Sequence, residues 1–207
     1  DHRDGTTTFV SPIAYIKEPS DGFIRIHSGS LIMEITPNHR VPHYNKKGEF
    51  KVAEAAQIMA VPSKRWIPTT FTPIDRPGLP MSDDLIRFAV LMHADGFYPK
   101  QGRKAGVTVR KQRKKDRIRQ ILSALGLKWK EFVYPKRPTE TIFKFESPYR
   151  GKRFTGGWWK ATPHQLAIIV DEMRHWVGHT GQGKLQYFSA HREDADFIQY
   201  AAHAIGQ

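Results

Sequence analysis

An aspartate at the end of a predicted helix is the residue of this chain best placed for catalysis. SDDLIRFAVLMHADG, residues 82–96, predicts a helix with Ser82 as its N-cap and Gly96 as its end. Asp95 then projects from the helix tip. A carboxylate there is a hard oxygen ligand for Mg²⁺, whose bound water can attack a phosphodiester. The alternative is that Asp95 only closes a turn, since Asp-Gly is a common turn pair.

The pattern around this helix occurs twice. LIRFAVLMHADG aligns with AIIVDEMRHWVG, and KDRIRQILSALG aligns with ADFIQYAAHAIG at nearly the same distance along the chain. An internal duplication predicts a pseudo-twofold domain, which suits a near-twofold target such as duplex DNA. Val177 stands in the second copy where Asp95 stands in the first, and valine cannot bind Mg²⁺.

The positive charge also points to nucleic acid. The sequence has 33 Lys and Arg against 20 Asp and Glu, a formal net charge of +13, and Asp116 is the only acid between Arg103 and Arg119. Alternation in Val107-Thr108-Val109-Arg110 and in Phe143-Lys144-Phe145 predicts strands with one buried and one cationic face, which can lie in a DNA groove. The expected DNA-binding residues are Arg103, Arg110, Lys111 and Arg113 in the groove, Lys114 and Lys115 on phosphates, and Lys104.

Two domains of the α+β class are expected. The runs SPIAYI, GFIRIHSG and SLIMEIT and a hairpin in HYNKKGEFKV predict a β-rich domain over residues 1–75, which ends in the proline-rich IPTTFTPIDRPGLP. A second domain is expected over 76–207. Its predicted helices cover 82–96, 114–126, 162–178 and 192–206, and its predicted strands lie within 97–111, 129–134, 141–146 and 183–189.

Composition excludes several classes of protein. A hydrophobic content of 39% is enough to build a core, and the absence of cysteine excludes disulfides, thiolate metal sites and thiol nucleophiles. The first residues have no basic-then-apolar pattern, and no apolar run is long enough to cross a bilayer. We therefore expect a cytoplasmic protein with no membrane partner.

FAVLMHADGF and the second copy, which ends in His175-Trp176-Val177-Gly178, resemble the paired helices of the LAGLIDADG (DOD-type) homing endonucleases over about residues 82–207. The resemblance implies a pseudo-twofold αββαββα domain with a saddle-shaped DNA-binding sheet. It also implies site-specific cleavage of double-stranded DNA, with Mg²⁺, or Mn²⁺ in its place, held by the acids that end the two helices. Asp95 matches the first of these acids, and Val177 departs from the second.

Lys160, in GGWWKATP, resembles a catalytic lysine that related enzymes carry before their second helix. The alternative is an exposed lysine beside a helix start. In the given sequence the second copy stops at Gln207, before any counterpart of the strands predicted near 129–146, so either the sequence is cut short or the second half is naturally short.

Thr36 and His39, in ITPNHRV, resemble the block B motif of inteins and other Hint domains. The resemblance implies an all-β Hint-like segment in which this threonine and histidine activate a peptide bond for acyl transfer. The alternative is a turn with a surface histidine. Splicing by this chain alone is not expected, because it starts with Asp1 and does not end in a His-Asn pair.

The leading hypothesis is a metal-dependent, intein-associated or phage-type homing endonuclease from a microbe or phage, monomeric with an internal pseudo-twofold. A partner chain or a second protomer could supply the missing acid. One alternative is a catalytically lapsed or nicking DNA-binding protein on the same scaffold. A second is a fragment of a protein-splicing intein that a partner chain completes.

Overall fold

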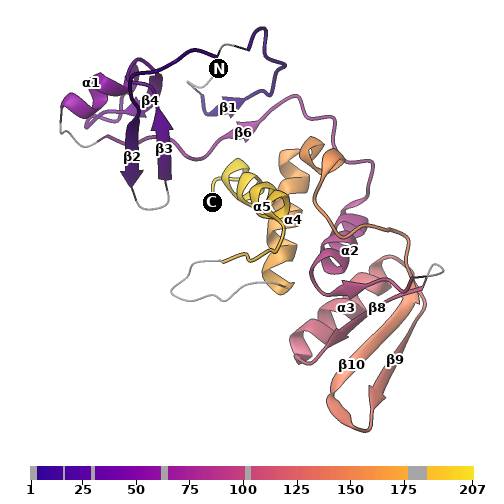
Figure 1. Cartoon of the computed structure of the whole chain (residues 1–207). Helices are drawn as coiled ribbons and strands as arrows, with labels where there is room; N and C mark the ends of the chain where they lie inside the picture. The colour runs from indigo at the N-terminus through magenta and orange to yellow at the C-terminus, as the bar shows by residue number, and fades with distance from the viewer. Residues whose placement is uncertain (1–3, 16, 29–30, 62–64, 101–103, 177–185) are drawn as a thin grey trace. The chain divides into compact units, whose positions relative to one another are not determined.

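The structure is a computed structural model that describes residues 4–15, 17–28, 31–61, 65–100, 104–176 and 186–207. It divides into two compact units, Asp1–Pro73 and Ile74–Ile205, each with its own helices and strands (Figure 1). The prediction of a mixed α+β protein is confirmed. Within the described residues, no helix is both long and apolar enough to cross a membrane.

The first unit consists of two hairpins, a short helix and a short parallel strand pair. Its elements are β1 (Thr6–Thr7), β2 (Ile24–Ser28), β3 (Leu31–Ile35), β4 (Arg40–Tyr44), β5 (Phe50–Glu54), α1 (Ala55–Ala60) and β6 (Thr72–Pro73). β2 pairs with β3 and β4 with β5, both antiparallel, and β1 pairs with β6. Val41, Ala55 and Ile58 form its small buried core. The predicted hairpin in HYNKKGEFKV is confirmed as part of β4 and β5.

Two expectations for this unit are corrected. The segment is not all β, because AAQIMA forms α1, which begins with a capping box between Glu54 and Gln57. The described residues of SPIAYI form no strand. Ile13 and Tyr15 are almost fully exposed, so this run lacks the packed neighbour that a strand needs.

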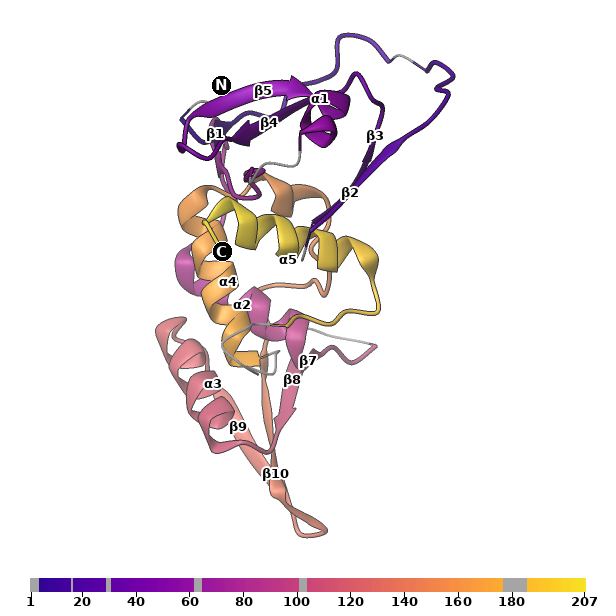
Figure 2. The same ribbon diagram turned by 90° about the vertical axis from the view of Figure 1, so that its left-hand side faces the viewer.

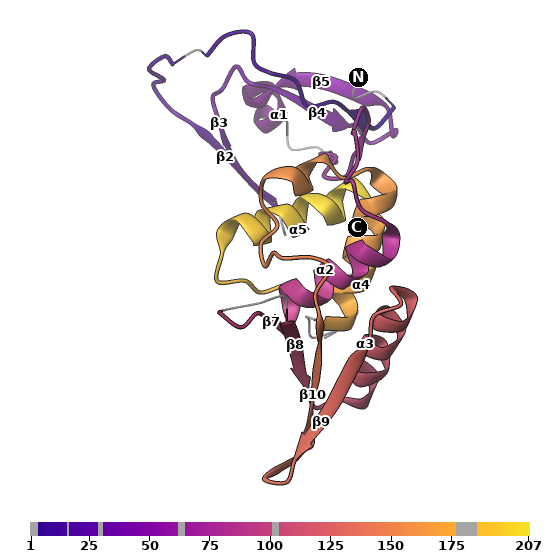
Figure 3. The same cartoon turned by 90° about the vertical axis from the view of Figure 1, so that its right-hand side faces the viewer.

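The second unit contains one antiparallel sheet together with the longer helices of the chain. The elements are α2 (Asp83–Ala94), β7 (Gly96–Phe97), β8 (Lys104–Val109), α3 (Gln112–Ala124), β9 (Trp129–Tyr134), β10 (Arg137–Glu146), the 3₁₀ helix η1 (Gly156–Lys160), α4 (Pro163–Trp176) and α5 (Arg192–Ala204). All four predicted helices form, and so do the strands predicted near 129–134 and 141–146. The sheet order is β7-β8-β10-β9, and α3 lies along one side of it (Figures 2 and 3).

The two copies of the repeat differ in their strands. The first helices of the copies, α2 and α4, pack against each other, and α5 packs against α4. Between α4 and α5, however, the described residues 186–191 form no strand, although one was predicted over 183–189. Phe188 is 74% exposed there, so no sheet covers it. Among the described residues, the sheet of this unit therefore comes from the first copy alone.

Candidate nucleic-acid interface

One face of the sheet packs against helices and forms one side of a hydrophobic core. Val107 and Val109 of β8 and Phe143 and Phe145 of β10 are buried on this face. The Phe145 ring meets the Phe88 ring of α2 edge-on at 5.6 Å between centroids, and the Arg119 guanidinium of α3 lies over Phe143. Because α2 and α3 cover this face, the residues that alternate with its core residues must point to the opposite face.

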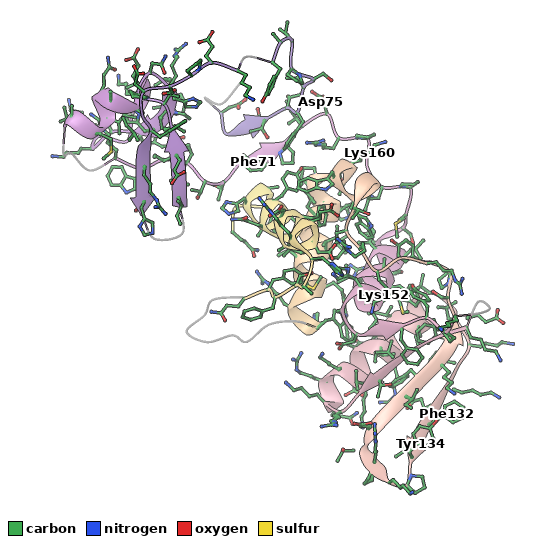
Figure 4. The ribbon with its side chains drawn as sticks, viewed as in Figure 1. Phe71, Asp75, Phe132, Tyr134, Lys152 and Lys160 are labelled. Atoms are coloured by element: carbon green, nitrogen blue, oxygen red, sulfur yellow. The ribbon has the colours of Figure 1, made fainter. Side chains whose placement is uncertain are left out.

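That opposite face carries lysines on three neighbouring strands. Lys104 of β8, Lys144 of β10 and Lys130 of β9 are exposed, and Lys144 lies directly opposite Lys130 in the strand register. Two aromatic side chains of β9 accompany them: Phe132 is 40% and Tyr134 is 52% exposed (Figure 4). We call these five residues the cationic face.

Contacts within the cationic face combine charge with aromatic rings. The Lys144 ammonium lies 5.1 Å from the centroid of the Phe132 ring, a cation–π distance. At the neighbouring edge, the Phe97 ring of β7 lies against Gly106, where a Cβ would come within 2.6 Å of the ring and 2.8 Å of the Phe143 carbonyl oxygen. Only glycine at position 106 lets Phe97 lie this close to the sheet.

Asp95 lies at the end of α2, as predicted, but its charge is already neutralised. Its Oδ2 accepts a hydrogen bond from the Lys114 ammonium at 2.5 Å, and both side chains are largely buried. The next residue is glycine, Gly96, because a Cβ at this position would lie only 2.7 Å from the Met92 backbone. An acid of this kind can hold Mg²⁺ only in competition with the lysine.

The other possible metal ligands do not complete a site. Among the described residues, no three His, Asp or Glu side chains gather in a metal-binding group. Val177, which aligns with Asp95, lies outside the described residues. The described side chains therefore do not fit the Mg²⁺ or Mn²⁺ that the resemblance implies.

Lys160 and Asp95 do not share a site. Lys160 ends η1, just before α4 begins, and its carbonyl accepts a hydrogen bond from Gly78. Asp95 lies instead near Trp176, the last residue of α4, through their common partner Lys114. The 14 residues of α4 separate its two ends by about 20 Å. Lys160 therefore lies far from the carboxylate with which it was expected to act.

A different lysine, Lys152, lies beside the Asp95-Gly96 turn. Its ammonium donates to the Gly96 carbonyl oxygen, and its loop is distant in sequence from α2 (Figure 4). Sequence reasoning did not select it, because no motif or periodicity marks a loop lysine as a neighbour of residue 96.

The residues expected to bind DNA lie on different elements of the second unit and differ in their exposure. Lys104 lies on the cationic face, Arg110 follows β8 and is exposed, and Lys111 is exposed at the N-cap of α3. Lys115 is half-buried on α3. Arg103 lies outside the described residues.

Arg113 and Lys114 have a structural role. Arg113 donates to the His175 carbonyl oxygen at 2.8 Å, and Lys114 donates to the Trp176 carbonyl oxygen at 2.9 Å. Both cations thus satisfy carbonyls at the C-terminus of α4, where positive charge is favourable. Lys130 and Lys144, in contrast, were not among the expected DNA contacts, although the alternation in Phe143-Lys144-Phe145 indicated a cationic strand face.

Thr36 and His39 form a compact turn between β3 and β4. The Thr36 hydroxyl donates to Oδ1 of Asn38 at 2.7 Å, and the His39 amide donates to the Thr36 carbonyl at 3.0 Å. The His39 side chain is exposed. These contacts match the turn interpretation, and the threonine hydroxyl is directed to Asn38.

His93, on α2, gives the second unit a predictable pH dependence. Its ring stacks on Phe154 at 3.9 Å and shares a hydrogen bond with the Tyr187 hydroxyl, and burial lowers its pKa below the usual 6.5. Below pH 6.5 the unfolded chain takes up this proton more readily, so the stability from neutral His93 is lost as the pH falls toward the folded-state pKa. We expect the urea midpoint to fall between pH 7.5 and 5.5, and to fall less in His93→Gln. An equal decline in both proteins would contradict this assignment.

Comparison with known proteins adds no assignment: no protein-family model matches the sequence, and no curated protein sequence is significantly similar to it.

Proposed function

We propose that the second unit binds double-stranded DNA through its cationic face, on a scaffold of the LAGLIDADG type. The observation that carries the proposal is the exposure of Lys104, Lys144 and Lys130 on three neighbouring strands, on a sheet face that α2 and α3 leave uncovered. Lys144 lies directly opposite Lys130 in the register, and Lys104 lies opposite Glu146. Neighbouring strands lie about 4.8 Å apart, so Lys144 and Lys130 form a close pair of cations, and Lys104 lies diagonal to Lys144 on the next strand. Cations placed in this way can neutralise phosphates of a nucleic acid.

The strand geometry favours a duplex over a single strand. A two-stranded β ribbon fits the major groove of B-form DNA, which is about 12 Å wide. β9 and β10 form such a ribbon, with Lys130 and Lys144 side by side on its open face. Exposed Phe132 and Tyr134 could instead stack on unpaired bases, so a preference for single strands is the competing outcome.

The Asp95–Lys114 ion pair favours binding without cleavage. A carboxylate that holds an ammonium at 2.5 Å carries little net charge for a dication. We therefore propose the catalytically lapsed form of the scaffold, in which Asp95 and Lys114 join α2, α3 and the end of α4.

The proposal is tested by fluorescence anisotropy with a pool of random 30-base-pair duplexes between 50 and 200 mM salt. Each neutralised phosphate contributes about −0.9 to the slope of log affinity against log salt, so three lysines predict a slope near −3 or steeper. Tighter binding of single strands than of duplexes, or an affinity independent of salt, would refute the proposal.

The same protein is then incubated with supercoiled plasmid and Mg²⁺ or Mn²⁺. We expect the plasmid to remain supercoiled with both the native chain and Asp95→Asn. Nicking by the native chain that Asp95→Asn abolishes would support the endonuclease in place of the lapsed protein.

A further inference from the structure

A carboxylate shielded by two arginines lies where β8 and the β9–β10 hairpin end. Glu140 Oε1 accepts from Nε of Arg110 at 3.0 Å and from Nη2 at 2.5 Å, and its Oε2 lies 3.4 Å from Nη1 of Arg137. The Glu140 side chain is only 10% exposed, whereas those of Arg110 and Arg137 are 73% and 71% exposed. The acid is thus covered, and both guanidinium groups face the solvent.

Strand alternation puts this group on the same side of the sheet as the cationic face. Arg110 follows Val109, and Glu140 precedes Thr141; Val109 and Thr141 are buried and pair with each other in the register. Arg110 therefore points away from the helices, and its hydrogen bonds hold the Glu140 carboxylate on that face. Arg137 pairs with Tyr134, beyond a register shift in the hairpin. The group thus extends the cationic face at the hairpin end.

The arrangement differs from that of an ordinary surface ion pair. Two exposed partners gain little from pairing, because both must be ordered against water. Here one buried acid orders two cations, and hydrogen bonding from Arg110 holds the pKa of the Glu140 carboxyl below its usual range. The carboxylate consequently keeps its charge at neutral pH and can hold both arginines.

The guanidinium N–H groups of Arg110 and Arg137 that do not bind Glu140 suit base recognition better than phosphate binding. Among the described residues, the hydrogen bonds to Glu140 leave Nη1 of Arg110 and Nε and Nη2 of Arg137 without a partner, so each arginine has part of its planar fork available. Guanine presents O6 and N7 in the major groove, and an arginine fork binds both at once. The acid lowers the net charge of the group to one, which weakens attraction to phosphate but leaves directional donors in place.

We infer that Glu140 is a positioning residue that holds Arg110 and Arg137 in place to recognise guanine in the major groove. The inference rests on the proposed binding of duplex DNA. It assigns sequence preference to the hairpin end and general phosphate attraction to the lysines of the cationic face.

The test begins with selection of preferred duplexes from a random pool by the native chain. Affinity is then measured for the best duplex and for versions with each guanine replaced by adenine, which keeps N7 but replaces the O6 acceptor with a donor. We expect at least one guanine to contribute about 10-fold or more in affinity. The guanine ratio is the affinity for the best duplex divided by the affinity for the version with adenine at that position. Glu140→Gln should reduce the guanine ratio to near one, while the affinity for scrambled duplex stays the same or rises.

Glu146→Gln is the matched control. Glu146 is an exposed residue of β10 that lies opposite Lys104, so this substitution removes the same charge from the same sheet face. In the part of the chain that the structure describes, Glu146 makes no hydrogen bond or ion pair with either arginine. It should leave the guanine ratio unchanged. Arg110→Lys and Arg137→Lys keep the charge but lose the fork, so at least one of them should lose the ratio as Glu140→Gln does. These variants also serve if Glu140→Gln does not fold, as checked by circular dichroism.

The outcomes separate this inference from the proposed function. No duplex binding by the native chain would refute both. Salt-dependent binding with no guanine preference, or a preference that survives in Glu140→Gln and in both lysine variants, would refute the inference alone. Equal loss of preference in Glu146→Gln would show that general charge, and not the position of the arginines, determines it.

Discussion

Replacing Lys104, Lys130 and Lys144 together by glutamine is expected to lower the affinity for random duplex DNA roughly 100-fold or more at 0.1 M salt. Each phosphate contact that is lost removes the free energy of releasing about one counterion, which is worth close to a factor of 10 at this salt concentration. The slope of log affinity against log salt should become shallower by about 3. The three side chains are exposed, so the fold should be unaffected.

The control removes the same number of charges elsewhere. Lys46, Lys47 and Lys51 are exposed on the β4–β5 hairpin of the first unit. Their replacement by glutamine should change the affinity less than 5-fold. If this control variant loses as much affinity as the first, the attraction comes from the net charge of the chain and not from the cationic face.

Replacing Glu172 by alanine is expected to destabilise the second unit by about 3–5 kcal/mol, the usual cost of removing one partner of a buried ion pair. Glu172 is 1% exposed and accepts hydrogen bonds from Arg117 of α3 and from the Trp176 indole at 2.7 Å. Its hydrogen bond with Arg117 raises the pKa of that guanidinium. Alanine would leave Arg117, whose side chain is 22% exposed, without its partner.

Urea unfolding followed by circular dichroism measures this loss. Glu131→Ala is the control, because Glu131 pairs with Arg119 where both side chains are about a third exposed. That pair should contribute less than about 1 kcal/mol. A double variant with leucine at positions 117 and 172 should recover much of the loss, because apolar side chains need no partner. Equal destabilisation by Glu131→Ala and Glu172→Ala would contradict the assignment.

Local sequence patterns were sufficient for most elements of the second unit. Ser82 and the Asp95-Gly96 pair bracket α2, and the Ser82 hydroxyl accepts from the Leu85 amide. Alternating residues predicted strands within β8 and β10. These signals succeed because caps and alternation act within a few residues of backbone. The run SPIAYI has the composition of a strand, but composition cannot supply a neighbouring strand.

Which residues lie together in the candidate sites depends on contacts between parts of the chain that are distant in sequence. Asp95 could be recognised as a helix-end acid from its motif, but its neutralisation by Lys114 requires α3 to pack across the ends of α2 and α4. Lys160 looked close to the same site only because its motif precedes the second helix.

The sequence by itself determined where the helices of the second unit and most of its strands form, that lysines alternate with core residues, and that the chain is strongly cationic. Tertiary packing decided which cations remain free: Lys114 and Arg117 are held in ion pairs, and Lys130 and Lys144 face solvent side by side. The physical reason is that an ion pair depends on the distance between side chains in space. Residues 55 apart in sequence, such as Arg117 and Glu172, meet only when their helices pack.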